Sequence, residues 1–89
     1  MTKRYLEVTF RDGKPVAAYL HLPRRAGDKS IRSERLGGGL VVDFAEGDRP
    51  IGIEITAPEV LSLEVLNGAL IGLKQAPATA AEIALLAAA

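Results

Sequence analysis

The chain has 89 residues, a formal net charge of zero and no cysteine. A domain of this length buries only about 60–65% of the surface that its unfolded chain exposes, so we expect a single domain, residues 1–89, with a limited core. The missing cysteines exclude disulfides, thiolate metal sites and a cysteine nucleophile, and the balanced charge excludes a large overall field that would attract nucleic acid or an anionic membrane.

The first two predicted strands form a hairpin. From Tyr5 to Phe10, apolar side chains alternate with others at the period of a half-buried strand. Asp12-Gly13 supplies the positive φ angles of a tight turn, and the alternation resumes from Val16 to Leu22. We therefore expect an antiparallel hairpin that begins directly after a few polar residues, with no targeting segment before it.

Three further strands are predicted after a polar, basic loop. The stretch from Ile31 to Leu36 is highly charged, which is typical of an edge strand where charges discourage pairing between molecules. Three glycines form a flexible connection to the alternating stretch from Leu40 to Phe44, and the turn from Glu46 to Pro50 leads into Ile51 to Ile55. Residues 1–57 thus predict an antiparallel β-meander of about five short strands, in which the last two pair around their turn.

The period changes to that of a helix after Pro58. Leucines recur at helical spacing from Leu63 to Leu73 behind Ser62, a good N-cap residue. Thr79-Ala80-Ala81-Glu82 has the form of a capping box and predicts a second, alanine-rich helix. The predicted fold is therefore α+β, with two C-terminal helices in residues 58–89 packed on the sheet. The expected core consists of Leu6, Val8, Leu20, Leu22, Val42, Ile53, Leu66, Leu70 and Leu73.

The expected cellular location follows from two features that the sequence lacks, a membrane-spanning stretch and cysteine residues. The longest apolar stretch, from Val60 to Leu73, contains polar residues and is shorter than the roughly 20 apolar residues that span a bilayer. We therefore expect no membrane association. Together with the missing cysteines, this favours a cytoplasmic protein.

One part of the chain carries a pattern shared with a known family. The pattern consists of Val42-Asp43-Phe44, Ile51-Gly52-Ile53-Glu54-Ile55 and the earlier Tyr19-Leu20-His21-Leu22. On these residues the chain resembles the bacterial domain of unknown function family 2283, and the match is strongest over Ile31 to Ile55. The segment before Val16 and the helical part depart from the family pattern. The resemblance implies a fold of antiparallel strands and no particular activity, so it transfers no catalytic residue.

The sheet face opposite the core is the candidate place for chemistry. It should present Glu7, Tyr19, His21, Asp43 and Glu54, together with Tyr5, Thr9 and Thr56. A histidine beside carboxylates can serve in acid–base catalysis or bind a metal, so a small enzyme or metal site is one hypothesis. A solvated sheet face, however, carries polar residues without any such function. We favour that second reading and assign no catalytic, cofactor-binding or metal-binding residue and no cofactor.

Two further hypotheses concern binding. The segment from Arg24 to Arg35 holds the main concentration of basic residues: Arg24, Arg25, Lys29, Arg32 and Arg35. It could contact phosphates in a nucleic-acid-associated regulator, but no stacking aromatics are interleaved, so nucleic-acid binding is the alternative. The leading hypothesis is a small non-enzymatic interaction or accessory module that associates with itself as a homodimer or with another protein. A small core gains stability from a partner, and an open sheet has edges to offer.

Overall fold

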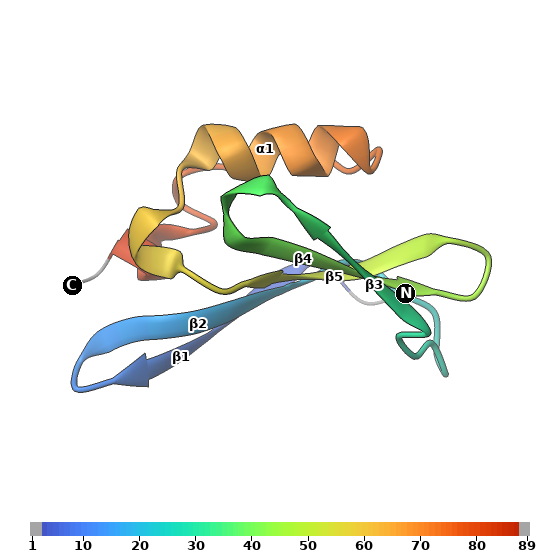
Figure 1. Ribbon diagram of the computed structural model, residues 1–89, viewed down its shortest axis with the longest axis horizontal. Coiled ribbons are helices and arrows are strands. Elements are labelled where there is room, and N and C mark those ends of the chain that lie inside the picture. The colour runs from blue at the N-terminus through green and yellow to red at the C-terminus, as the bar shows by residue number, and fades with distance from the viewer. Residues whose placement is uncertain (1–2, 88–89) are drawn as a thin grey trace.

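The computed structural model describes residues 3–87 as a five-stranded antiparallel sheet with helical segments over one face (Figure 1). The strands are β1 (Tyr5–Arg11), β2 (Lys14–His21), β3 (Arg32–Leu36), β4 (Leu40–Ala45) and β5 (Arg49–Ile55). The described helices are α1 (Leu63–Gly72) and the 3-10 turns η1 (Gly37–Gly39), η2 (Pro58–Val60) and η3 (Ala84–Ala87). The predicted α+β class and the five strands are therefore confirmed.

The strand order differs from the predicted meander. Neighbouring strands follow the order β1-β2-β5-β4-β3, and every pair is antiparallel. The β4–β5 pairing is confirmed, but β2 lies beside β5 and not beside β3. The physical reason is the character of the two strands: β5 buries Ile51, Ile53 and Ile55 and occupies the centre, whereas the charged β3 suits the edge. Residues 22–31 carry the chain past the β4–β5 hairpin to that edge.

The β1–β2 hairpin extends beyond the rest of the sheet. The predicted tight turn is confirmed, and both Asp12 and Gly13 have positive φ angles, 52° and 77°. Strand β2 pairs with β5 only from Ala18 to His21, which leaves residues 10–17 as a two-stranded arm, seen at the lower left of Figure 1. Phe10, which the alternation places on the apolar face, is 44% exposed because it lies on this arm.

The core lies between the sheet and the helical layer. Six of the nine predicted core residues are buried: Leu20, Leu22, Val42, Ile53, Leu66 and Leu70. Leu6, Val8 and Leu73 are partly buried and pack against this cluster. The predicted faces of the strands are therefore confirmed.

One α-helix, not two, follows the sheet within residues 3–87. Helix α1 begins where predicted, because Ser62 Oγ accepts a hydrogen bond from the Val65 amide at 3.1 Å. The second helix predicted from the capping box is wrong. Thr79 Oγ1 accepts from the Glu82 amide at 3.2 Å, but the Glu82 side chain turns toward Arg4 and only the short turn η3 follows. A segment this short gains too few helical hydrogen bonds to nucleate an α-helix alone. The last two residues of that prediction lie outside the described part.

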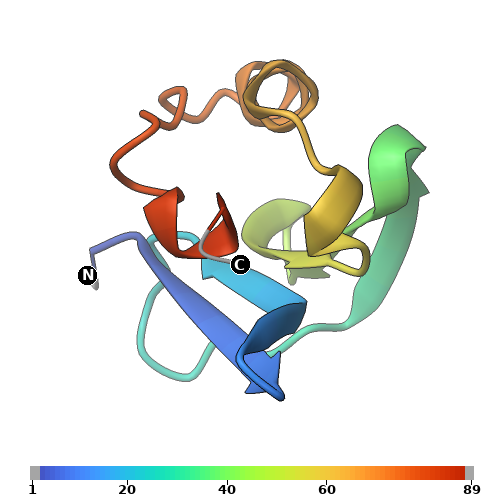
Figure 2. The same ribbon diagram turned by 90° about the vertical axis from the view of Figure 1, so that its left-hand side faces the viewer.

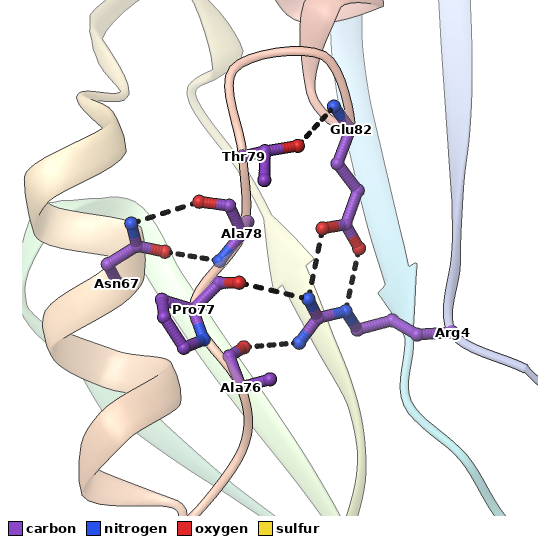
Figure 3. Close-up of polar contacts among 7 residues, drawn as sticks. All are labelled: Arg4, Asn67, Ala76, Pro77, Ala78, Thr79 and Glu82. Carbon is purple, nitrogen blue, oxygen red and sulfur yellow. Dashed lines mark hydrogen bonds and ion pairs between the residues drawn. The ribbon is translucent and has the colours of Figure 1, made fainter.

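The segment of residues 76–82 is held by hydrogen bonds from two side chains, Arg4 and Asn67 (Figure 3). The Arg4 guanidinium donates to both Glu82 carboxylate oxygens at 2.7 and 2.9 Å and to the carbonyls of Ala76 and Pro77. From α1, the Asn67 amide donates to the Ala78 carbonyl at 3.1 Å and accepts from its N–H at 2.7 Å. The segment consequently lies between α1 and the β1–β2 hairpin, as Figure 2 shows.

Candidate functional site

The sheet register brings the predicted polar residues into two adjacent rows on the face opposite the core. One row runs across all five strands through Tyr5, His21, Gly52, Asp43 and Ser33. The next row consists of Glu7, Tyr19, Glu54, Val41 and Arg35. We call these two rows the polar face. The predicted residues therefore share one face, and the strand order decides which of them touch.

His21 is enclosed by neighbours on this face. Its Nε2 lies 2.9 Å from Glu7 Oε1, and its Nδ1 lies 3.5 Å from Nη2 of Arg24. The ring stacks on Tyr5 with a centroid distance of 4.2 Å and meets Tyr19 edge-on at 4.7 Å. The imidazole is therefore oriented by four side chains, with a partner near each ring nitrogen.

Tyr19 reaches over β5 to a residue of β4. Its hydroxyl donates to Asp43 Oδ2 at 2.7 Å, and Asp43 Oδ1 accepts from the Ser33 hydroxyl of β3. Gly52 makes this crossing possible, because a Cβ built on it would lie 1.9 Å from the Tyr19 hydroxyl oxygen. Burial, then the hydrogen bond to Asp43 and its negative charge, raise the pKa of Tyr19 to about 12. Side-chain hydrogen bonds thereby join β2, β4 and β3, with β5 lying between β2 and β4.

Arg24 joins the loop after β2 to the same network. Its guanidinium donates to the Ile51 carbonyl of β5 at 2.8 Å. Its positive charge lies close enough to Tyr19 to oppose the rise of that residue's pKa. This residue, predicted as part of a phosphate-binding segment, thus holds its loop against the sheet.

Two further predicted residues, Glu54 and Thr56, have surroundings different from those of this network. Glu54 is exposed, and with Glu7, Thr9 and Tyr19 it lines an open hollow of about 200 Å³. The Thr56 hydroxyl donates to the Gly39 carbonyl at 2.8 Å, near the start of β4. Among residues 3–87, no group of three or more His, Asp or Glu side chains is placed to hold a metal ion. The face thus brings Glu7, Tyr19, His21 and Asp43 together and leaves Glu54 at the side.

The other basic residues of the segment from Arg24 to Arg35 include Arg32, which has acidic partners, and Arg25, which is exposed. Arg32 lies over the Phe44 ring, 4.0 Å from its centroid, and pairs with Glu34 at 2.9 Å and Asp48 at 3.0 Å. Arg25 is exposed, and its backbone N–H donates to Asp28 at 2.9 Å. Within this segment, the charge of Arg32 is therefore compensated by two carboxylates.

Asp28 connects the loop after β2 to the start of β5. Its carboxylate accepts two hydrogen bonds from the Arg49 guanidinium, at 2.6 and 2.8 Å. These bonds, followed by the bond from the Arg25 amide, lower the pKa of Asp28 to about 2. The loop is thus tied to the sheet by a bidentate ion pair that stays charged over the ordinary pH range.

The two edges of the sheet differ in character. Edge strand β3 carries three charged side chains among its five residues, and Arg32 and Glu34 pair with each other. Edge strand β1 carries only Glu7 and Arg11 among seven residues, and its Tyr5 and Phe10 are 54% and 44% exposed. Unpaired backbone groups on an edge with few charges favour pairing with another chain. Strand β1 is therefore the candidate interaction edge.

Exposed apolar side chains also occur away from the sheet edges. Ile71 of α1 and Leu85 of η3, which the helical pattern places off the inward stripe, are 62% and 54% exposed. Val60 of η2 is 73% exposed. These side chains belong to separate segments of the helical layer.

Sequence reasoning missed two members of the polar network. Ser33 looks like an ordinary residue of a charged edge strand, and only its pairing with Asp43 reveals its role. Gly52 stands out as the single glycine of an otherwise isoleucine-rich strand, and that irregularity is a signal for close approach by another group.

Comparisons with known proteins agree with the resemblance found in the sequence. No curated protein and no solved structure matches the chain. No helix in the described part is long and apolar enough to cross a membrane. The model of a family described as "Protein of unknown function (DUF2283)" matches residues 17–57, which hold Tyr19, Asp43 and Gly52. This match supports a DUF2283 assignment for residues 17–57 of the chain.

Proposed function

We propose that the protein is a non-enzymatic interaction module of the cytoplasm whose partner is a second copy of itself, in a symmetric homodimer. The observation that carries this proposal is the contrast between the two sheet edges. Strand β3 is protected by charged side chains, whereas β1 offers seven extended residues with two exposed aromatic rings. A two-fold symmetric dimer is the commonest assembly in which a surface of one chain binds the same surface of a second copy.

The polar face supports a structural role for its side chains. Tyr19, His21 and Asp43 are each engaged with neighbouring side chains, and the network links strands that are distant in sequence. Enzyme sites are usually concave pockets that surround their ligand, and the hollow beside Glu54 is open. Absence of cysteine from the sequence supports the cytoplasmic location.

Light scattering coupled to size-exclusion chromatography tests the proposal. At low micromolar concentration we expect a mass of about twice the 9.4 kDa of one chain. A mass of 9.4 kDa that persists on concentration would overturn it.

A gel-shift assay at low salt separates this proposal from a nucleic-acid-associated regulator. We expect no retardation of mixed-sequence DNA or RNA. Strongly salt-dependent retardation that is lost on neutralising Arg25 and Lys29 would favour the regulator instead.

A further inference from the structure

We infer that two copies join through antiparallel pairing of their β1 strands about a two-fold axis at Val8, which merges the two five-stranded sheets into one. This inference rests on the proposed self-association and names the surface and register that achieve it. It follows from the position of β1, the chemistry of its two faces and the exposure of its aromatic rings.

Strand β1 forms one edge of the described sheet. It is the outermost strand, and β2 is its neighbour in the sheet. The register shift between Thr9 and Phe10 places the extra residue, Val16, in β2, so β1 itself remains regular. A two-stranded arm is only marginally stable in water, and a third strand added at β1 would support it.

Charge and pairing length select the register. In a two-fold antiparallel pair, the residue at the axis opposes its own copy. An axis at Glu7 would oppose two like charges, which is destabilising. An axis at Thr9 would leave Tyr5 and Leu6 of β1 unpaired. With the axis at Val8, all seven residues pair.

The two faces of β1 are self-complementary in this register. On the core side, Phe10 lies opposite Leu6 of the second copy, and Leu6 already packs against the core. On the polar face, Tyr5 lies opposite Arg11 of the second copy, within reach of a cation–π contact. Glu7 lies opposite Thr9 of the second copy and diagonal to both Arg11 and Glu7 of that copy, so an attractive pair on one diagonal offsets a repulsive pair on the other. Pairing therefore covers the ring of Phe10, which is 44% exposed in the single chain.

Two substitutions of the exposed residue Thr9 test the register, because they should change the dimer dissociation constant in opposite directions. Thr9→Glu places a carboxylate against Glu7 of the second copy at two symmetric positions, and we expect the dimer dissociation constant to rise by about two- to thirty-fold. Thr9→Lys places a cation there and should lower the constant. Arg35→Glu, which adds a carboxylate to the opposite edge, serves as the control and should leave it unchanged. Circular dichroism confirms that each variant is folded.

Cross-linking provides the second readout, because the natural chain has no cysteine. We expect a mixture of the Glu7→Cys and Thr9→Cys variants to form a disulfide-linked dimer on oxidation. Neither variant alone should cross-link, since equivalent Cα atoms would then lie more than about 7 Å apart. A dimer that forms but shows neither cross-linking nor a response to the Thr9 substitutions would overturn this register and leave the proposed function standing. A chain that stays monomeric would overturn both.

Discussion

Replacing Gly52 by alanine should break the polar network at its centre. The added Cβ would lie 1.9 Å from the Tyr19 hydroxyl oxygen and 2.2 Å from its ring carbon Cζ. Atoms cannot approach so closely, so the ring must leave the surface of β5. With it goes the hydrogen bond from Tyr19 to Asp43 that crosses the strand.

The expected cost follows from two opposing contributions. Loss of a hydrogen bond to a charged group costs about 1.5–3 kcal/mol. Alanine in place of glycine within a strand returns about 0.5–1 kcal/mol. Displacement of the ring from its contact with His21 adds to the loss, so we expect Gly52→Ala to lower the free energy of unfolding by about 1–3 kcal/mol.

Urea unfolding followed by circular dichroism, at one fixed protein concentration, measures this cost. In a Tyr19→Ala background the obstructing ring is gone, and Gly52→Ala should then stabilise the protein by about 0.5–1 kcal/mol. Gly68→Ala on α1 is the control: its new Cβ would meet no atom within 4 Å outside the backbone of its own helix, and we expect about 1 kcal/mol of stabilisation. An equal effect of Gly52→Ala in both backgrounds would refute the reasoning.

Three further predictions concern the core, the C-terminal segment and high pH. Ile53→Ala, at a fully buried side chain, should cost about 2–5 kcal/mol in urea unfolding, and a loss below about 0.5 kcal/mol would contradict the assigned strand face. Asn67→Ala leaves the buried Ala78 backbone groups without their partner and should cost about 1–3 kcal/mol, whereas a surface-like value would contradict that role. The folded-state pKa of Tyr19 lies above its ordinary value of 10.0, so its contribution to stability is complete below that pH and is lost as pH rises toward about 12. In a Tyr5→Phe variant, ultraviolet titration of the remaining tyrosine should have its midpoint near 12, and a midpoint near 10.0 would contradict the burial of Tyr19.

The strands and their faces were accessible from the sequence, because alternation is a local property. The buried side chains Leu20, Val42 and Ile53 all lie on the faces that the pattern predicts. The strand order was not accessible in the same way, since alternation does not say which strand lies beside which. Placement of β5 next to β2 depends on contacts between residues far apart in the chain.

The polar network shows the same limit of local reasoning. Sequence alternation placed Tyr19, His21 and Asp43 on one face. Only the register, which sets His21 and Asp43 on either side of Gly52, brings the Tyr19 hydroxyl to the Asp43 carboxylate. The capping box at Thr79 led to a wrong helix prediction for a related reason. The Glu82 carboxylate, which in a capping box bonds back to the N-cap backbone, instead binds the distant Arg4.

The ion pair between Arg4 and Glu82 joins residues that are 78 positions apart in the chain. Closing a loop of that length costs about 2–3 kcal/mol more conformational entropy than closing a loop of about four residues. We expect contacts of this kind to form late in folding, after the local hairpins. Interactions that are absent from the transition state slow unfolding without accelerating folding. We therefore expect loss of the Arg4 pair to speed unfolding and to leave the folding rate nearly unchanged.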